Sequence, residues 1–290
     1  MNDLAHALSP ESLLATSTKM GPMLVASGKL SPKDLSLIVA TQKKHGLRFG
    51  DAAVQLGLVK AEDISAILAE QFAYTPTPAI SSKLDRRLSA LFQPDGIQAE
   101  ALRSLRSELM LRYFNPQPHS SLALVSAEDA AGTALTTANL AISFAQLGLR
   151  TLLIDSNLRS PQLNSLFNLP VHAPGLSDWI ANRTAVIPTA IEAVRSLWVL
   201  PAGTRAPNPQ ELLASRQYQE RLGPLIQTFD VTLISTAPID ANHDAQLVAA
   251  HAGAAVLIAQ AHVTRTKTLV AIGNRLRDLG VRLLGTTLRD

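Results

Sequence analysis

The chain has 290 residues, which suits one large domain or two modest ones, and its 47% hydrophobic content is typical of a globular protein. It contains no cysteine, which excludes disulfides, thiolate metal sites and cysteine nucleophiles, and a net charge of +3 is too small to indicate a nucleic-acid-binding protein. Seven of the eight lysines lie between Lys19 and Lys83 and the next is Lys267, so no lysine chemistry is available in the long interval between them.

The first residues lack a basic segment followed by an apolar one, so we expect no signal peptide. Two uncharged stretches of 20 residues, 130–149 and 245–264, have the length of membrane helices. Both carry several Thr, Asn, Gln or His residues, which favours buried elements of a soluble domain. We therefore expect a cytoplasmic protein.

A tandem repeat occupies the N-terminal part. Two 24-residue copies, Lys19–Gln42 and Arg48–Gln71, each place glycine at their third position (Gly21, Gly50) and tenth position (Gly28, Gly57). Each copy ends in an apolar helical pattern that follows an N-cap-like segment. The repeat predicts a small, mainly helical domain over residues 15–75.

A change of pattern follows the repeat. Prolines begin a predicted linker over 76–96, and 98–114 has the spacing of an amphipathic helix. From residue 121 onward, short apolar runs alternate with helical stretches. The expected strands are Leu122–Ser126, Thr151–Ile154, Leu197–Leu200, Val231–Ile234, Ala254–Ala259 and Val281–Leu284. This order predicts an α/β domain over 97–290 with a doubly wound, mostly parallel sheet.

The second domain resembles the bacterial tyrosine autokinases of exopolysaccharide synthesis, a P-loop group of the deviant Walker type. The resemblance rests on three segments, 152–161 (LLIDSNLRSP), 200–213 (LPAG through NPQELL) and 229–238 (FDV through STAP). It implies a P-loop NTPase-like fold and ATP-dependent protein-tyrosine kinase activity.

The first domain resembles the tandem MshE-type cyclic-di-GMP module, which also precedes the kinase domain in the EpsG-like, chain-length-determinant-associated subgroup. A duplicated motif suits a ligand with two guanines and two phosphates. The residues that the resemblance assigns to cyclic di-GMP are Lys19, Gly21, Gly28, Gln42, Arg48, Phe49, Gly50, Gly57 and Gln71. Lys19 departs from the arginine of the motif, which puts the first half-site in doubt because the two cations are not equivalent at a stacking site. The alternative is a helical docking module whose glycines serve turns and whose leucines form a core.

The nucleotide site has lost its phosphate and metal ligands. The resemblance places Thr133 at the P-loop lysine and Ala134 at the Mg²⁺-binding hydroxyl, although Gly132 is retained. Asn157 and Ser235 stand where the family has aspartates, and Asp155 remains. We expect that catalysis is lost and that ATP with Mg²⁺ is not a cofactor. Weak Mg²⁺-independent nucleotide binding and an active kinase with an unorthodox site stay open as alternatives.

Two further expectations concern phosphorylation and assembly. The family carries a C-terminal tyrosine cluster, whereas the tyrosines here are Tyr74, Tyr113 and Tyr218. Glu100, Arg103 and Arg106 fit the Glu-x-x-Arg-x-x-Arg pattern of the family's ring-forming helix, and intrahelical ion pairs are the alternative.

The resemblance therefore predicts a regulatory assembly protein of exopolysaccharide synthesis and export, a pseudokinase responsive to cyclic di-GMP. The implied partner is a membrane chain-length-determinant protein, the polysaccharide co-polymerase, which would hold the protein at the inner membrane. Self-association or an active kinase paralogue is a second expected partner. We expect neither a metal centre nor a nucleic-acid partner.

Overall fold

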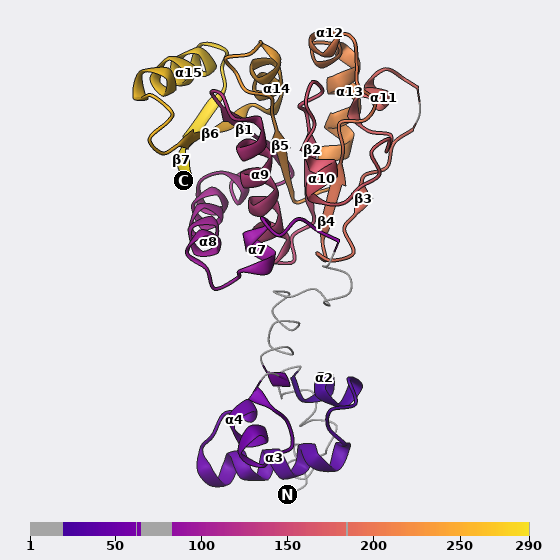
Figure 1. Cartoon of the computed structure of the whole chain (residues 1–290), viewed down its shortest axis with the longest axis vertical. Helices are drawn as coiled ribbons and strands as arrows, with labels where there is room; N and C mark the ends of the chain where they lie inside the picture. Colours follow the sequence, from indigo (N-terminus) through magenta and orange to yellow (C-terminus); the bar gives the residue numbers. More distant parts are fainter. Residues whose placement is uncertain (1–19, 62, 65–82, 184, 290) are drawn as a thin grey trace, which may run out of the picture. The chain divides into compact units, whose positions relative to one another are not determined.

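The computed structural model describes residues 20–61, 63–64, 83–183 and 185–289. The chain divides into two compact units, Met1–Thr75 and Pro76–Asp290. Each unit is considered by itself (Figure 1).

The first unit is helical over its described residues. It contains α2 (Met20–Ala26), α3 (Pro32–His45) and α4 (Phe49–Gln55). Ser31 and Asp34 form a capping box at the start of α3, and Gly46 ends that helix in the left-handed conformation. A small core of Leu24, Leu30, Ile38, Ala52, Ala53, Val59 and Ile64 holds the helices together.

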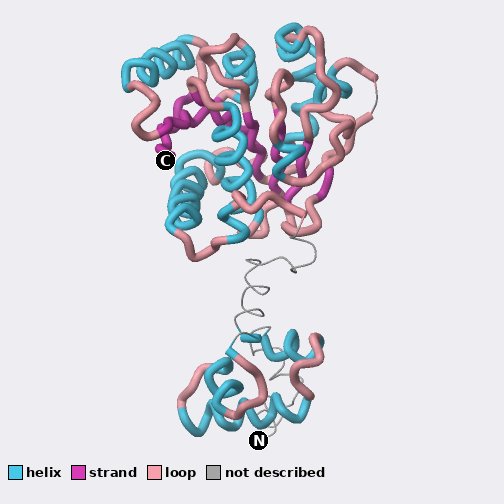
Figure 2. Tube along the Cα trace, viewed as in Figure 1, coloured by secondary structure: helices cyan, strands magenta, loops and turns pink. Residues whose placement is uncertain are grey.

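The second unit is built on a seven-stranded sheet of order β3-β4-β2-β5-β1-β6-β7 (Figure 2). The strands are β1 (Ser120–Ser126), β2 (Thr151–Asp155), β3 (Thr189–Ala190), β4 (Leu197–Leu200), β5 (Val231–Ser235), β6 (Ala254–Gln260) and β7 (Arg282–Arg289). Every pairing is parallel except that of the short β3 with β4. The predicted fold class is confirmed, and each of the six expected strands is present. β3 was not predicted because two residues carry no periodic signal.

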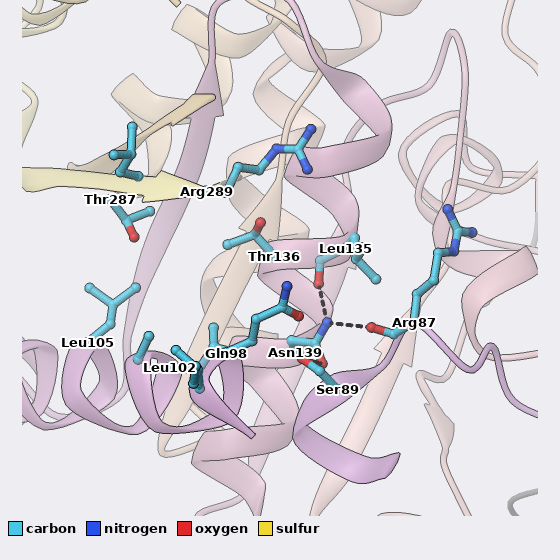
Figure 3. A pocket seen from close by; sticks show the side chains of 13 residues that line it. Arg87, Ser89, Gln98, Leu102, Leu105, Leu135, Thr136, Asn139, Thr287 and Arg289 are labelled. Carbon is cyan, nitrogen blue, oxygen red and sulfur yellow. Dashed lines mark hydrogen bonds between the residues drawn. The ribbon is translucent and has the colours of Figure 1, made fainter. Parts of the chain in front are cut away.

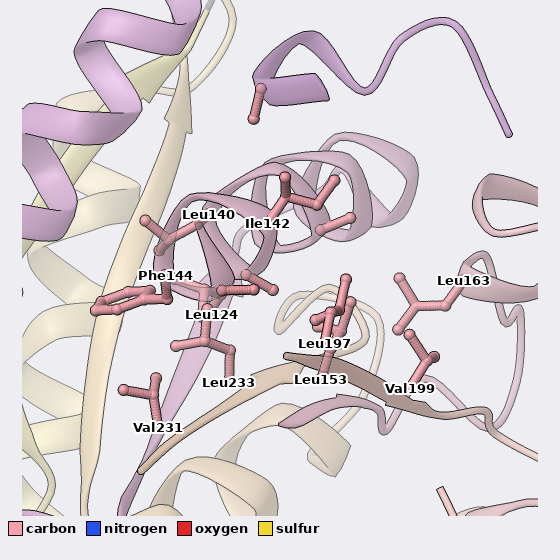
Figure 4. Packing of buried hydrophobic residues seen from close by; sticks show 14 of the residues in the cluster. Leu124, Leu140, Ile142, Phe144, Leu153, Leu163, Leu197, Val199, Val231 and Leu233 are labelled. Atoms are coloured by element: carbon pink, nitrogen blue, oxygen red, sulfur yellow. The ribbon is translucent and has the colours of Figure 1, made fainter. Parts of the chain in front are cut away.

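Helices cover both faces of the sheet. They are α7 (Ser89–Phe92), α8 (Ile97–Leu109) with a π-helical continuation η2 (Met110–Phe114), α9 (Ala130–Ala145), α10 (Leu163–Leu166), α11 (Leu176–Ile180), α12 (Pro209–Leu213), α13 (Arg216–Ile226), α14 (Asp244–Ala252) and α15 (Thr266–Asp278). Along β1, Leu122 and Leu124 enter the core under α7 to α10, whereas Ala123 and Val125 enter the core under α11 to α15. Figure 4 shows the first of these cores, with Phe144 of α9 near Leu124 and Leu233. The central strands β1, β2, β5 and β6 are thus buried on both faces, which explains their mostly apolar runs, whereas β3 and β7 at the edges are largely exposed or half-buried.

The expected linker, 76–96, extends too far. Residues 83–96 belong to the second unit, where Leu88 and Leu91 are buried in its core. Asn139 of α9 fixes this segment, since its Oδ1 accepts the backbone N–H of Ala90 at 2.9 Å and its Nδ2 donates to the Arg87 carbonyl at 3.3 Å (Figure 3). Residues 76–82 lie outside the described part of the chain.

Within the described part of the chain, no helix has the length and apolar character needed to cross a membrane. The two uncharged stretches instead form α9 and the α14–β6 region. Their polar side chains are accommodated inside the fold, as the buried Thr133, Thr137, Asn139 and Ser143 of α9 show.

Candidate functional site

The segment 126–134 comprises the last residue of β1, the connecting residues 127–129 and the first turn of α9, the place of a phosphate-binding loop in this fold. Thr133, at the position of the P-loop lysine, is fully buried. Its hydroxyl donates to the carbonyl of Asp129 at 2.5 Å and lies 2.6 Å from the hydroxyl of Ser126. Ala134 is also buried. The Thr133 hydroxyl therefore bonds to the loop from inside, and neither side chain is exposed to solvent.

A carboxylate of the chain itself occupies the N-terminus of α9. Asp129 is the N-cap residue, and its Oδ1 accepts the backbone N–H of Gly132 at 2.8 Å. The free N–H groups and the positive end of the helix dipole at such a terminus are what bind phosphate in nucleotide-binding proteins. Here one of those donors already has an anionic partner.

Arg289 neutralises this carboxylate. It lies at the end of β7, beside α9 (Figure 3), and its guanidinium forms an ion pair with Asp129 Oδ2. The two residues are 160 positions apart in sequence. We refer to them below as the Asp129–Arg289 pair.

Gly132 makes room for that pair. A Cβ atom at this position would lie 2.1 Å from Asp129 Oδ2 and 2.3 Å from Arg289 Cζ, far inside van der Waals contact. The glycine of the phosphate-binding motif is thus retained at a position where it contacts an internal ion pair. Sequence analysis did not identify this pair, because no local pattern connects two residues that are 160 positions apart.

Asp155, at the end of β2, is buried and stabilises its own loop. Its carboxylate accepts backbone N–H groups of Asn157 at 3.1 Å, Gln162 at 2.9 Å and Leu163 at 3.0 Å. Burial raises the pKa of this carboxyl to about 6, although the three hydrogen bonds act in the opposite direction. The Asp155 carboxylate therefore stabilises the turn that follows β2 by accepting these three backbone hydrogen bonds.

The other two metal positions lie at the same edge of the sheet. Ser235 pairs with Asp155 across β5 and β2, and its carbonyl accepts the N–H of Ser156 at 2.9 Å. Asn157 Oδ1 accepts the N–H of Ser160 at 3.1 Å. The structure thus brings Asp155, Asn157 and Ser235 together, as the resemblance implies. Among the described residues no group of three His, Asp or Glu side chains is arranged to hold a metal ion.

An ion pair that the sequence did not single out joins this edge to α14. The Arg159 guanidinium contacts both oxygens of the buried Asp244, with Nε–Oδ2 at 2.6 Å and Nη2–Oδ1 at 3.3 Å. The carboxylate raises the pKa of the Arg159 guanidinium. This bidentate geometry fixes the loop after β2 against the first turn of α14.

The charged side chains of α8 form hydrogen bonds and ion pairs within the second unit. Glu100 and Arg103 form an ion pair at 2.5 Å, and Arg103 also donates to the Pro94 carbonyl at 2.7 Å. Arg106 is buried and donates to the carbonyl of Ser143 on α9 at 2.8 Å. The Glu100–Arg103 pair corresponds to the intrahelical alternative, whereas Arg106 is directed onto α9; the ring-forming role of the three residues stays a prediction.

In the first unit, the described residues of the second copy, 48–61 and 63–64, repeat the glycine contacts of the first copy. Gly28 and Gly57 have φ values of +71° and +68°, and each closes a helix by donating its N–H to Val25 and Val54, respectively. A Cβ at Gly21 would lie 2.9 Å from Leu35, and one at Gly50 would lie 2.9 Å from Ile64. All four contacts repeat at the 29-residue displacement between the copies, so the glycines have identical structural roles in both.

The polar candidates of this unit have different environments. Arg48 is exposed at the start of α4, and the Gln42 amide donates weakly to the Leu47 carbonyl at 3.4 Å. Phe49 is partly buried, with its ring near Gly21. Lys29 forms an ion pair with Asp63 at 3.0 Å and thereby connects the two copies. Lys19 and Gln71 lie outside the described residues.

No family model matches the chain. Among curated proteins it is 33% identical over 198 residues to CapB of Staphylococcus aureus, named among the tyrosine-protein kinases, covering 68% of this chain and 86% of CapB. It is 31% identical over 205 residues to the tyrosine-protein kinase Wzc of Salmonella typhimurium, covering 70% of this chain and 28% of Wzc. The solved BceF tyrosine kinase domain is 30% identical, with a TM-score of 0.63 over 75% of this chain and 91% of that domain.

Proposed function

Because this chain belongs to the bacterial tyrosine-protein kinase family, we propose that it is a non-catalytic member, a pseudokinase that acts in the regulation and assembly of exopolysaccharide synthesis. The observation that carries the proposal is the Asp129–Arg289 pair at the N-terminus of α9. An internal carboxylate is bonded where a nucleotide phosphate would bind.

Substitutions at the expected lysine and metal positions also support the pseudokinase proposal. A phosphoryl-transfer site stabilises charge with a lysine and a metal ion. Thr133 and Ala134 are buried, and Ser235 has no carboxylate to offer a metal. A nucleotide would have to displace the Asp129 carboxylate from the Gly132 N–H, and no lysine lies between Lys83 and Lys267 to compensate.

The test is ATP binding and turnover with Mg²⁺, measured on the full chain by calorimetry and phosphate release. We expect neither in the wild-type protein. The alternative, an active tyrosine autokinase with an unorthodox site, predicts turnover that Asp155→Ala abolishes. Mg²⁺-dependent turnover that is lost in Asp155→Ala and kept in Arg195→Ala, an exposed control, would overturn the pseudokinase proposal.

Cyclic di-GMP is the second part of the proposed function, as the ligand of the first unit. The supporting observation is the structural equivalence of the two copies, which repeats the same backbone turn at Gly28 and Gly57. A repeated site suits a ligand with two equivalent halves. Arg48 is exposed and available to stack on guanine or to donate to its O6 and N7 atoms.

Calorimetric titration of cyclic di-GMP into the full chain tests this assignment. We expect binding in the wild-type protein and at least tenfold weaker binding in Arg48→Ala, with no change in Lys44→Ala, a control on the exposed end of α3. An absence of heat in the wild-type protein would reduce the unit to a docking module.

The proposed partner is a membrane polysaccharide co-polymerase, contacted by the second unit and regulated through the first. In this scheme the protein is cytoplasmic, and cyclic di-GMP alters docking rather than phosphorylation. A titration of the purified cytoplasmic segments of the co-polymerase, with and without cyclic di-GMP, measures the coupling. Equal affinities in the two titrations would contradict it.

A further inference from the structure

The positive charge of the protein is concentrated at its C-terminal end. The last 30 residues contain six basic and two acidic residues, whereas the preceding 260 contain 20 basic and 21 acidic. The whole net charge of +3 thus originates in α15 and β7. These elements lie at one edge of the sheet (Figure 1).

Five of the six basic residues in this segment form no ion pair within the described part of the chain, and the sixth, Arg289, is paired with Asp129. Arg87, Arg103, Arg112, Arg150, Arg159, Arg183, Arg216 and Arg289 each form an ion pair. Within the described ranges, Arg265, Lys267, Arg275, Arg277 and Arg282 form none, and all five are exposed. Arg277 contacts the Asn274 amide, and Arg282 contacts the Arg112 carbonyl and lies 5.9 Å from the Tyr113 ring. All five side chains remain accessible to solvent, although the Arg282 guanidinium also contacts η2.

Exposed apolar side chains accompany these charges. α15 buries Ile272, Gly273 and Leu276 against the sheet. Its outer face carries Lys267, Val270, Asn274 and Arg277 at the 3-4-3 spacing of one helix side, with the exposed Arg275 on the flank of that side two turns after Lys267, and Val270 is 56% exposed. Val263 before the helix and Leu279 after it are 51% and 48% exposed.

We propose that the outer face of α15, with Arg265 and Arg282 at its two ends, binds directly to an anionic lipid surface. Cations that surround shallow apolar side chains match the interface of an anionic bilayer, where headgroups attract the cations and the apolar side chains enter the headgroup region. An acidic polypeptide would satisfy the charges but leave Val263, Val270 and Leu279 exposed. The contact is independent of the kinase-like site and of the proposed partner, because it requires only lipid.

Flotation of the full chain with vesicles tests the proposal. We expect binding to vesicles with about one third phosphatidylglycerol and much weaker binding to pure phosphatidylcholine. Neutralising two charges in Arg275→Gln/Arg277→Gln should lower the partition coefficient roughly 30-fold. The matched control, Arg195→Gln/Arg205→Gln, removes two exposed arginines elsewhere in the same unit and should leave it unchanged. Raising the salt from 0.15 to 0.5 M should weaken binding, since it shortens the screening length.

Three results would overturn the proposal. The first is equal binding to neutral and anionic vesicles, and the second is an equal loss in the control variant. The third is a protein that does not bind vesicles but binds polyglutamate or DNA, with this binding abolished in Arg275→Gln/Arg277→Gln. That result would show that the face binds a different polyanion. Circular dichroism of both double variants establishes that they are folded, and Val270→Ser provides a second test, because it should weaken vesicle binding without changing the charge.

Discussion

Arg289, at the end of β7, forms an ion pair with Asp129 at the first turn of α9, and Gly132 is the residue whose missing side chain permits this contact. The glycine that the resemblance places in the phosphate-binding motif lies against an internal salt bridge. Gly132 is therefore expected to be coupled energetically to Arg289.

A double-mutant cycle measures that coupling. Gly132→Ala should displace the guanidinium and lower the free energy of unfolding by about 2 kcal/mol, whereas Arg289→Ala, which removes a partly exposed pair, should cost about 1 kcal/mol. Because the pair is already lost in Arg289→Ala, the added alanine at 132 should then cost less than it does in the wild-type protein. Urea unfolding of the four proteins tests this, and strictly additive values would contradict the contact.

Thr133 is predicted to be structural. Thr133→Val removes the hydrogen bonds to the Asp129 carbonyl and the Ser126 hydroxyl inside the loop, which should cost about 1 to 3 kcal/mol. Thr133→Lys places a cation at a fully buried position and should destabilise the unit further without producing ATP binding. Thermal unfolding and ATP calorimetry of both variants provide the measurements. ATP binding by a stable Thr133→Lys protein would show that the loop is still a phosphate site.

The buried Asp155 should make stability depend on pH. Its pKa is about 6 in the folded protein and close to the ordinary value of 3.8 in the unfolded chain, so the folded state binds the extra proton between these values. This contribution is fully present below about pH 4 and is lost as pH rises through 6, with an upper limit of about 3 kcal/mol. The stability difference between the wild-type protein and Asp155→Asn should therefore change between pH 4 and 7. A difference that is constant over that range would contradict the raised pKa.

Arg106 and Arg103 should respond differently to substitution, although both belong to the Glu-x-x-Arg-x-x-Arg pattern. Arg106→Ala leaves the buried Ser143 carbonyl without this donor and should cost about 2 to 3 kcal/mol, whereas Arg103→Ala should cost less than about 1 kcal/mol. Chemical unfolding together with light scattering separates stability from assembly. A loss of oligomers in Arg106→Ala without any loss of stability would support the ring-contact interpretation for this residue.

The glycines of the repeat should tolerate asparagine better than alanine at the turns. Gly57 has φ +68° with no atom within 4 Å of a Cβ, so Gly57→Ala meets only backbone strain of about 1 to 2 kcal/mol. Asparagine enters the left-handed region more readily and should cost less. Equal losses for the two substitutions, measured by hydrogen exchange of the first unit, would contradict a purely conformational role.

Local sequence patterns predicted most of the architecture. Runs such as Leu122–Val125 and Ala254–Ala259 are apolar at every position because these central parallel strands are buried on both faces. The glycine spacing indicated the duplication, and threonine at position 133, where the resemblance places a lysine, led us to expect an altered nucleotide site. The short β3 and the packing of residues 83–96 were not predictable, since the first lacks periodicity and the second depends on Asn139 of a later helix.

What the sequence by itself determined is which residues are absent from the kinase-like site. What only the tertiary structure decided is what replaced them. The crossover connections of the sheet bring the end of β7 to the start of α9, so Arg289 meets a carboxylate 160 residues away. Contacts of that kind follow from strand order and helix placement rather than from local periodicity, which is why the loss of the site was visible in the chain and its internal occupant was not.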